Sequence, residues 1–295
     1  MGYFAVRGFW IDSGLRYREE ESLISSIART KQIAGVGQKG VEISDDERLQ
    51  KWNEGINSLF DGGSSNNIWQ NDPSLRLLHH VMQQHTLSKE HFDRILLGRE
   101  IDVNTKQYAT VQSLTGHVEM GCGSLLYLVL ECADIYENDN SNDVIYKAAK
   151  HIAKTHGLSN ALRLSVPKAT TTGKIILPQE LCDKYGIKSP RYLRSALGMG
   201  DEECKRLLQS AVEDIVKAAR MHLNEARSLR DEIISGPHGA KALSTFLHSL
   251  ASETFFDRLE DHDFNLTDRR LRNVGMEEHF KCGTRMIASS FRKLF

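Results

Sequence analysis

Two pairs of aspartates are spaced one helical turn apart, the spacing at which two carboxylates on one helix face can chelate a divalent cation. The pairs are Asp139 with Asp143 and Asp257 with Asp261. The first pair falls in a polar stretch before an expected helix, where aspartate commonly caps the helix. The second pair lies among arginines, which favours a solvated mixed-charge surface. Neither pair therefore predicts a metal site.

Histidines and short catalytic motifs give no stronger signal. The densest histidine group is His79, His80 and His85, but neighbouring residues on a helix point about 100° apart. The sequence has no HExxH, no GxSxG and no Walker loop. The letters Gly35-x-Gly37-x-x-Gly40 match a dinucleotide-binding loop, but no strand–helix–strand pattern surrounds them. The residues alone therefore predict no active site, no metal and no cofactor.

Composition limits the remaining classes. The 295 residues are 40% hydrophobic and 26% charged, which suits a globular chain with a sizeable core. A formal net charge of −1 gives no electrostatic reason to bind nucleic acid. The five cysteines are scattered without zinc-site spacing, which favours a reducing compartment. The N-terminal stretch carries Asp12 and three consecutive glutamates, so it reads as neither a signal peptide nor a transit peptide.

Apolar residues recur at helical spacing along almost the whole chain, and only five prolines interrupt them. Ser44-Asp45-Asp46-Glu47 is a capping-box pattern, and Asp72-Pro73 is a good N-cap and first-turn pair. The periodicity predicts helices from these two starts and further helices over about 88–101, 106–135, 143–166, 207–223, 241–261 and 276–294. Residues 61–72 are predicted to form a polar loop, and Ala169–Leu177 an extended flap. We expect one all-α domain over residues 1–295.

Once the helices are placed, three segments resemble the squalene/phytoene synthase family in the right order. Phe4-Ala5-Val6-Arg7 resembles the run before the family's first aspartate-rich motif, and Leu97-Gly98-x-x-x-Asp102 resembles its Gly-x-x-x-Asp segment. The most specific match is His156 to Arg163 followed by Gly173 to Pro178, which resembles the Asn-x-x-Arg and Gly-x-x-x-Leu-Pro signature. The resemblance implies a single-domain helical bundle of the isoprenoid synthase type. The family's first helix is expected to be missing, and residues 35–43 to be an insertion or loop.

The resemblance also implies where chemistry would occur and why it is absent here. Family enzymes hold Mg²⁺ with two DxxxD motifs, and the metal neutralises the diphosphate leaving group. These motif positions fall here on residues other than aspartate: Trp10, Gly14, Leu164 and Lys168. A vestigial pocket is implied at the matching motif residues: Asp12, Asp102, Asn160, Arg163, Gly173 and Pro178. We therefore expect a pseudoenzyme without a bound metal.

Further stretches resemble a subgroup of this family that has lost the aspartates and assists the assembly of respiratory complex I. They include Ser124-Leu125-Leu126-Tyr127-Leu128 and the ending Phe291-Arg292-Lys293. The resemblance implies a mitochondrial location on the matrix side of the inner membrane, with complex I subunits or other assembly factors as partners. Two alternatives stay open: an active or residual prenyl diphosphate transferase, and an isoprenoid- or lipid-binding protein without turnover.

The last helix also leaves an alternative open. Residues 267–295 carry seven Lys or Arg against three Asp or Glu, with apolar residues interleaved. Such a basic amphipathic helix suits peripheral contact with an anionic leaflet of the inner membrane. The simpler interpretation is a last helix packed on the bundle.

Overall fold

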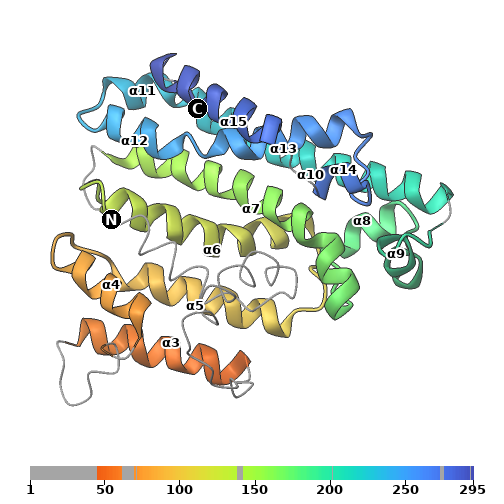
Figure 1. The fold of residues 1–295 in the computed structure, drawn as a ribbon, viewed down its shortest axis with the longest axis horizontal. Coiled ribbons are helices and arrows are strands. Elements are labelled where there is room, and N and C mark those ends of the chain that lie inside the picture. Colours follow the sequence, from red (N-terminus) through yellow and green to blue (C-terminus); the bar gives the residue numbers. More distant parts are fainter. Residues whose placement is uncertain are drawn as a thin grey trace.

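A computed structural model gives the fold of residues 45–61, 70, 72–137, 142–200, 202–272, 276–292 and 294–295. In these described ranges the secondary structure is helical. Successive long helices lie side by side from α3 through α5, α6 and α7, and α10 and α13 cover the other side of α7 (Figure 1). The main helices are α3 (Asp45–Phe60), α4 (Pro73–Met82), α5 (Lys89–Asn104), α6 (Val111–Glu131), α7 (Asp143–Thr172), α10 (Glu202–Ser228), α12 (Gly239–Phe246), α13 (Ser249–Asp261) and α15 (Met276–Arg292). This arrangement confirms the expected all-α bundle.

The core consists of three groups of buried apolar side chains that follow the helix order. One joins α3, α4 and α5, and includes Ile56, Leu78 and Phe92. The second joins the first half of α7 to α6 and α12. The third joins the second half of α7 to α10 and α13, with the short helices α8 (Gln179–Lys184) and α9 (Ser189–Ala196). α6 contributes to all three groups, through Leu114, Leu126 and Leu128, and α7 contributes to two, so these two helices form the centre of the bundle.

Helix starts follow the capping chemistry for α4, whereas the predicted helix over 106–135 begins too early. The Asp72 carboxylate accepts hydrogen bonds from the backbone N–H groups of Ser74 and Leu75. α6 begins only at Val111, where Thr110 and Ser113 form a reciprocal capping box. The preceding residues are not helical, and they bond to another segment: Ile175 N–H donates to Lys106 O, and Gln179 N–H donates to Tyr108 O. Long-range pairing therefore overrides the local helical pattern here.

α7 is longer than its sequence pattern predicts. The sequence pattern predicts a helix ending at about Val166, yet α7 continues through Pro167 to Thr172. Val166, Lys168 and Ala169 are buried on either side of the proline, so packing stabilises the extra turn. Gly173 ends the helix in the left-handed conformation with φ of 67°. The predicted flap is thus correct for Lys174–Leu177 and wrong for Ala169–Thr172, which form the last helical turn.

One further predicted helix is divided, and several short helices were not predicted. The single helix over 241–261 is divided into α12 and α13. The short helices α8, α9, α11 (Arg230–Ser235) and α14 (Arg269–Arg272) were not predicted, because so few residues show no periodicity. The predicted insertion at 35–43 and most of the predicted loop at 61–72 lie outside the described residues.

α6 and α7 approach closely at Gly157, within the motif that carries the strongest family resemblance. A Cβ atom placed on Gly157 would lie 2.5 Å from Val118 Cβ and 3.2 Å from Val118 O. Real Cβ atoms do not approach other atoms so closely, so a larger residue would push the two helices apart. Glycine at this position sets the distance between the two central helices.

Candidate functional site

The side chain of Asp102 lies at the centre of a buried charged cluster between α5 and the end of α7. Lys168 Nζ donates to Asp102 Oδ2 at 2.8 Å, and Lys174 Nζ donates to Asp102 Oδ1 at 2.7 Å. Lys174 Nζ also donates to the backbone carbonyl of Asp102. His117 Nε2 lies 3.7 Å from Asp102 Oδ1, and its ring packs on Tyr108 with centroids 4.9 Å apart. The Asp102 cluster, defined as Asp102, His117, Lys168 and Lys174, joins α5, α6, α7 and the flap.

The two ammonium groups keep the Asp102 carboxylate ionised. Burial on its own would raise the pKa of Asp102, but Lys168 and Lys174 outweigh it and lower the pKa from 3.8 to about 2. Burial lowers the pKa of His117 to about 4, so its imidazole is neutral at physiological pH. The cluster therefore contains two cations and one anion. Its net charge is +1, so the Asp102 carboxylate is balanced by lysines without a metal ion.

The remaining vestigial pocket residues do not join this cluster. The Asn160 side chain bonds to the Cys122 thiol of α6. Arg163 faces α13, where Nη2 donates to Ala251 O at 3.2 Å and the guanidinium carbon lies 4.4 Å from the centre of the Phe255 ring. Gly173 caps α7, and Pro178 precedes α8. The structure thus brings together Asp102 and Lys168, while Asp12, Trp10 and Gly14 lie outside the described residues.

The described residues do not fit the magnesium site that the family resemblance implies. Leu164 and Lys168 occupy the two positions that match the second aspartate-rich motif. Leu164 is 38% exposed and offers only an alkyl group, and Lys168 directs an ammonium at Asp102. Within the described ranges no three His, Cys, Asp or Glu side chains gather closely enough to hold a metal ion. An ammonium repels Mg²⁺, so Lys168 does not fit the role of a metal ligand.

Two carboxylates of α13 pair with arginines that come from other helices, α10 and α15. Asp257 contacts Arg220 at 2.9 Å and Arg285 at 3.1 Å. Glu253 receives both terminal nitrogens of Arg227, at 2.8 and 2.9 Å, and also contacts Arg285. These ion pairs join α10, α13 and α15. The last helix therefore packs on the bundle, and Phe295 is buried against Phe246 at a centroid distance of 5.4 Å.

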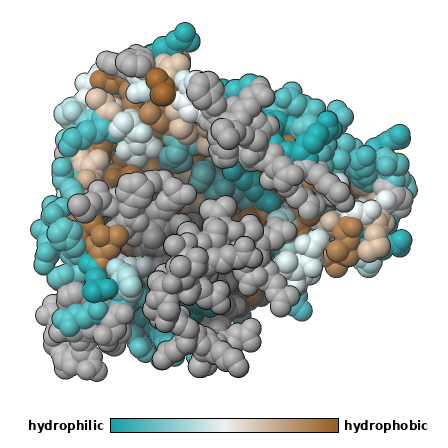
Figure 2. Space-filling view, in the orientation of Figure 1, coloured by the Kyte–Doolittle hydropathy of each residue, from teal (hydrophilic) through white to brown (hydrophobic). Residues whose placement is uncertain are grey.

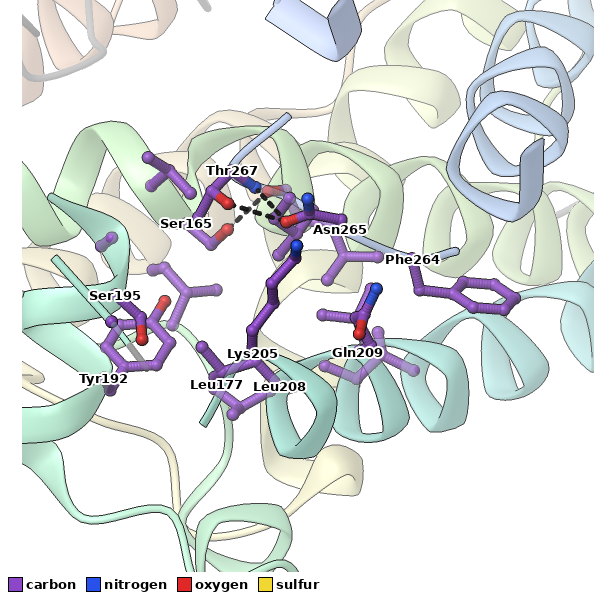
Figure 3. Close-up of a pocket in the computed structure, with 18 of the residues that line it drawn as sticks. Ser165, Leu177, Tyr192, Ser195, Lys205, Leu208, Gln209, Phe264, Asn265 and Thr267 are labelled. Atoms are coloured by element: carbon purple, nitrogen blue, oxygen red, sulfur yellow. Dashed lines mark hydrogen bonds between the residues drawn. The ribbon is translucent and has the colours of Figure 1, made fainter. Parts of the chain in front are cut away.

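A separate cavity of about 220 Å³ lies between α7, α9, α10 and residues 264–267 (Figure 3). Its interior is lined by apolar side chains from α7 and α10, including Leu162, Val166, Leu208 and Val212. Polar side chains stand on the same lining, among them Lys205, Gln209 and Asn265. The outer end of α9 is apolar: Leu197 is 54% and Met199 61% exposed, and Figure 2 shows a small hydrophobic patch at the end of the molecule where α8 and α9 lie.

Neither the Asp102 cluster nor this cavity was fully visible in the sequence. His117 and Lys174 come from other elements than Asp102, and the flap resemblance was the only signal that brought Lys174 near the motif. The cavity residues come from the apolar stripe of α10, from short elements without a motif, and from the apolar positions of the α7 and flap motif segments, such as Leu162 and Leu177. Their joint position depends on how α9 packs against α7, which no local pattern specifies.

The sequence pattern of the squalene/phytoene synthase family matches residues 25–277, and the chain belongs to this family. In fold it is similar to two solved structures. A squalene synthase from Alicyclobacillus acidocaldarius is 15% identical with a TM-score of 0.60, and the match covers 89% of each chain. A dehydrosqualene synthase in complex with ligand is 17% identical with a TM-score of 0.61, covering 97% of this chain and 85% of the other.

Among curated proteins the chain is similar to several named as complex I assembly factors. The homologue of NADH dehydrogenase (ubiquinone) complex I, assembly factor 6 from Drosophila melanogaster is 28% identical over 75% of this chain and 61% of its own length. The Mus musculus protein of that name is 25% identical over 78% of this chain and 62% of its own length. The Dictyostelium discoideum homologue is 29% identical over 74% of this chain and 56% of its own length. The chain thus spans about three fifths of the length of these relatives.

Proposed function

We propose that this chain is a non-catalytic assembly factor for mitochondrial respiratory complex I, built on the fold of a prenyl synthase. Its curated relatives are named as complex I assembly factors, and they match most of the chain. The observation that carries the loss of catalysis is the 2.8 Å pairing of Lys168 with Asp102. An ammonium holds the carboxylate there, at a position where the family resemblance calls for a metal ligand.

The proposed location is the matrix side of the inner mitochondrial membrane, with complex I subunits or other assembly factors as partners. The relatives' names support a mitochondrial role. No helix in the described part of the chain is long and apolar enough to cross a membrane. Peripheral contact with the membrane is compatible with the outer face of α15, where Ile287 is 61% exposed beside basic residues.

An active or residual prenyl diphosphate transferase is the competing function. It requires carboxylates that bind Mg²⁺ against a diphosphate, and Leu164 and Lys168 supply none. A protein that binds an isoprenoid or another lipid without turnover is compatible with the same fold. It does not compete with an assembly role, since a bound lipid requires no catalysis.

Loss of the gene tests the assembly role in the organism from which the chain comes. Complex I activity and the amount of assembled complex I should fall, while the other respiratory complexes keep their activity. Re-expression of the chain should restore complex I, and a variant with Gly157→Val, which separates α6 from α7, should not. Unchanged complex I after loss of the gene would refute the proposal.

A further inference from the structure

The cavity of Figure 3 is distinct from the Asp102 cluster, although both contact α7. Its α7 lining consists of Ala161, Leu162, Ser165 and Val166, which recur on one side of the helix. Lys168 instead contacts α5 through Asp102. The cavity therefore opens between α7 and α10, away from the residues that match the second aspartate-rich motif. It needs an explanation of its own.

The size and lining of the cavity define the apolar part of a ligand. Protein interiors are close-packed, and voids larger than a water molecule are few. A cavity of about 150 Å³ with an aliphatic lining takes up one benzene molecule. The volume here is about 220 Å³, and its walls include Leu114, Leu177 and Ile215. Scaled by volume from that benzene cavity, the space suits an unbranched or methyl-branched chain of roughly eight to ten carbons.

The polar side of the cavity defines the head group. Lys205 and Gln209 are one helical turn apart on α10, and Figure 3 shows the Lys205 side chain extending toward Asn265 and Thr267. Asn265 Oδ1 accepts hydrogen bonds from the Thr267 N–H at 3.2 Å and from Thr267 Oγ1 at 2.7 Å. The oxygen of the Asn265 amide is thus occupied, and its nitrogen is the end that can donate to a ligand. One ammonium and two amide groups form a donor set that favours an anion.

Glu202 is the one acidic side chain among the described residues of this lining, and it contacts Lys205 only loosely. The distance between Lys205 Nζ and Glu202 Oε2 is 3.5 Å, and the Glu202 side chain is 80% exposed. An exposed pair of this kind contributes little free energy, so the anionic head of a ligand can displace Glu202 at small cost. Lys205 is therefore available to a ligand.

The turn between α9 and α10 shapes the entrance. Gly198 has φ of 77°, a left-handed conformation that favours glycine. A Cβ atom on Gly200 would lie 2.0 Å from Ser195 Oγ, so the turn folds tightly back on α9. The exposed side chains of Leu197 and Met199 belong to the same turn. An apolar rim beside a cationic side chain is the surface expected at the entrance to a lipid site.

We propose that this cavity binds a single-chain anionic amphiphile, with a chain of roughly eight to ten carbons inside and its head group at Lys205. A fatty carboxylate and an isoprenoid monophosphate share this chemistry. The site is independent of the assembly role, because binding is measured on the purified chain. Failure of this proposal therefore leaves the proposed function untouched.

Titration calorimetry of the purified chain with decanoate, geranyl monophosphate and decanol tests the proposal. Binding of either anion in preference to the neutral alcohol is expected, and the preferred anion identifies the head group. Lys205→Met should weaken that binding roughly tenfold or more, because a charge-assisted hydrogen bond is lost. The matched control is Lys217→Met, which removes a cation that pairs with Glu213 on the same helix and should leave the affinity unchanged.

A second pair of variants separates the cavity from the surface. Ala161→Phe fills the cavity from α7 and should abolish binding, whereas Leu164→Phe enlarges an exposed side chain of the same helix and should not. Equal melting temperatures of the variants show that loss of binding is not loss of the fold. Absence of binding by both anions would overturn the proposal. So would binding that neither Lys205→Met nor Ala161→Phe weakens, because the ligand would then lie elsewhere.

Discussion

Lys168 of α7 donates a hydrogen bond of 2.8 Å to Asp102 of α5, two residues that are 66 positions apart in the chain. The Lys168 side chain is only 7% and the Asp102 side chain only 11% exposed. Burying either charge without its partner is costly, so the two positions depend on one another. In this chain the pairing has a structural role at a place where the family resemblance calls for metal chemistry.

Asp102→Asn should be more damaging than Lys168→Met. The asparagine variant leaves Lys168 and Lys174 buried close together without a counter-charge, and we expect a loss of about 3–5 kcal/mol in the free energy of unfolding. Lys168→Met leaves the Asp102–Lys174 pair intact and should cost about 1–3 kcal/mol. Urea unfolding measures both. Equal and small effects, like that of removing the exposed Lys217, would show that the cluster does not stabilise the fold.

Gly157→Ala should destabilise the protein, because its methyl group would meet Val118 across the α6–α7 contact. Overpacking of this kind costs about 1–3 kcal/mol. Gly116 is the matched control, since it lies in α6 with open space around the position of a Cβ atom. Gly116→Ala should be neutral or stabilising by up to about 1 kcal/mol. A higher melting temperature for Gly157→Ala than for Gly116→Ala would show that α6 and α7 do not approach closely at Gly157.

The resemblance located Asp102 and Lys168, but the sequence could not show that they touch. Helical periodicity predicted most of the long helices, because a buried helix face repeats along the chain. It failed where distant segments compete: Lys106 bonds to Ile175 of the flap and Tyr108 bonds to Gln179 at the start of α8, so neither residue joins α6. It also ended α7 too early at Pro167, since burial of Val166 and Lys168 outweighs the local cost of proline. His117, Lys174 and Lys205 act through partners on other elements, which no spacing rule identifies.

Acid should destabilise the protein below about pH 6.5 through buried neutral histidines. Burial lowers the pKa of His156 from 6.5 to about 3, and that of His91 to about 4. The unfolded chain takes up protons near pH 6.5 that the folded chain refuses, so this stability is complete above pH 6.5 and is lost as the pH falls. Each such histidine contributes a slope of about 1.4 kcal/mol per pH unit within that window.

Urea unfolding from pH 7 down to about 4 measures this dependence. His156→Gln retains a group that can bond to Ser252 Oγ, which His156 Nδ1 contacts at 2.9 Å, but it cannot titrate. The difference in bound protons between the unfolded and folded states should therefore fall by about one, which lowers the slope of the free energy of unfolding against pH. A slope identical to that of the parent chain would show that His156 is protonated in both the folded and unfolded states.

Glu253→Gln should loosen the last helix. Burial would raise the pKa of Glu253, but Arg227 and Arg285 lower it below its usual range, so the carboxylate is ionised and joins α10 to α15. We expect a loss of about 1.5–3 kcal/mol and faster amide hydrogen exchange in α15. Glu260→Gln is the control, because the Glu260 side chain is 64% exposed and pairs with Arg220 of α10. Unchanged exchange in α15 would mean that apolar contacts alone hold this helix.

Diphosphate release by the purified chain, incubated with Mg²⁺ and farnesyl diphosphate, tests directly whether the chain is non-catalytic. We expect no release above that of the protein-free reaction and no prenyl product, because Lys168 and Leu164 stand at positions where carboxylates would hold the metal. A known active member of the family serves as the positive control. Mg²⁺-dependent release that disappears in the Asp102→Asn variant would refute the proposed loss of catalysis, since the chain would then carry out the chemistry of the family's enzymes.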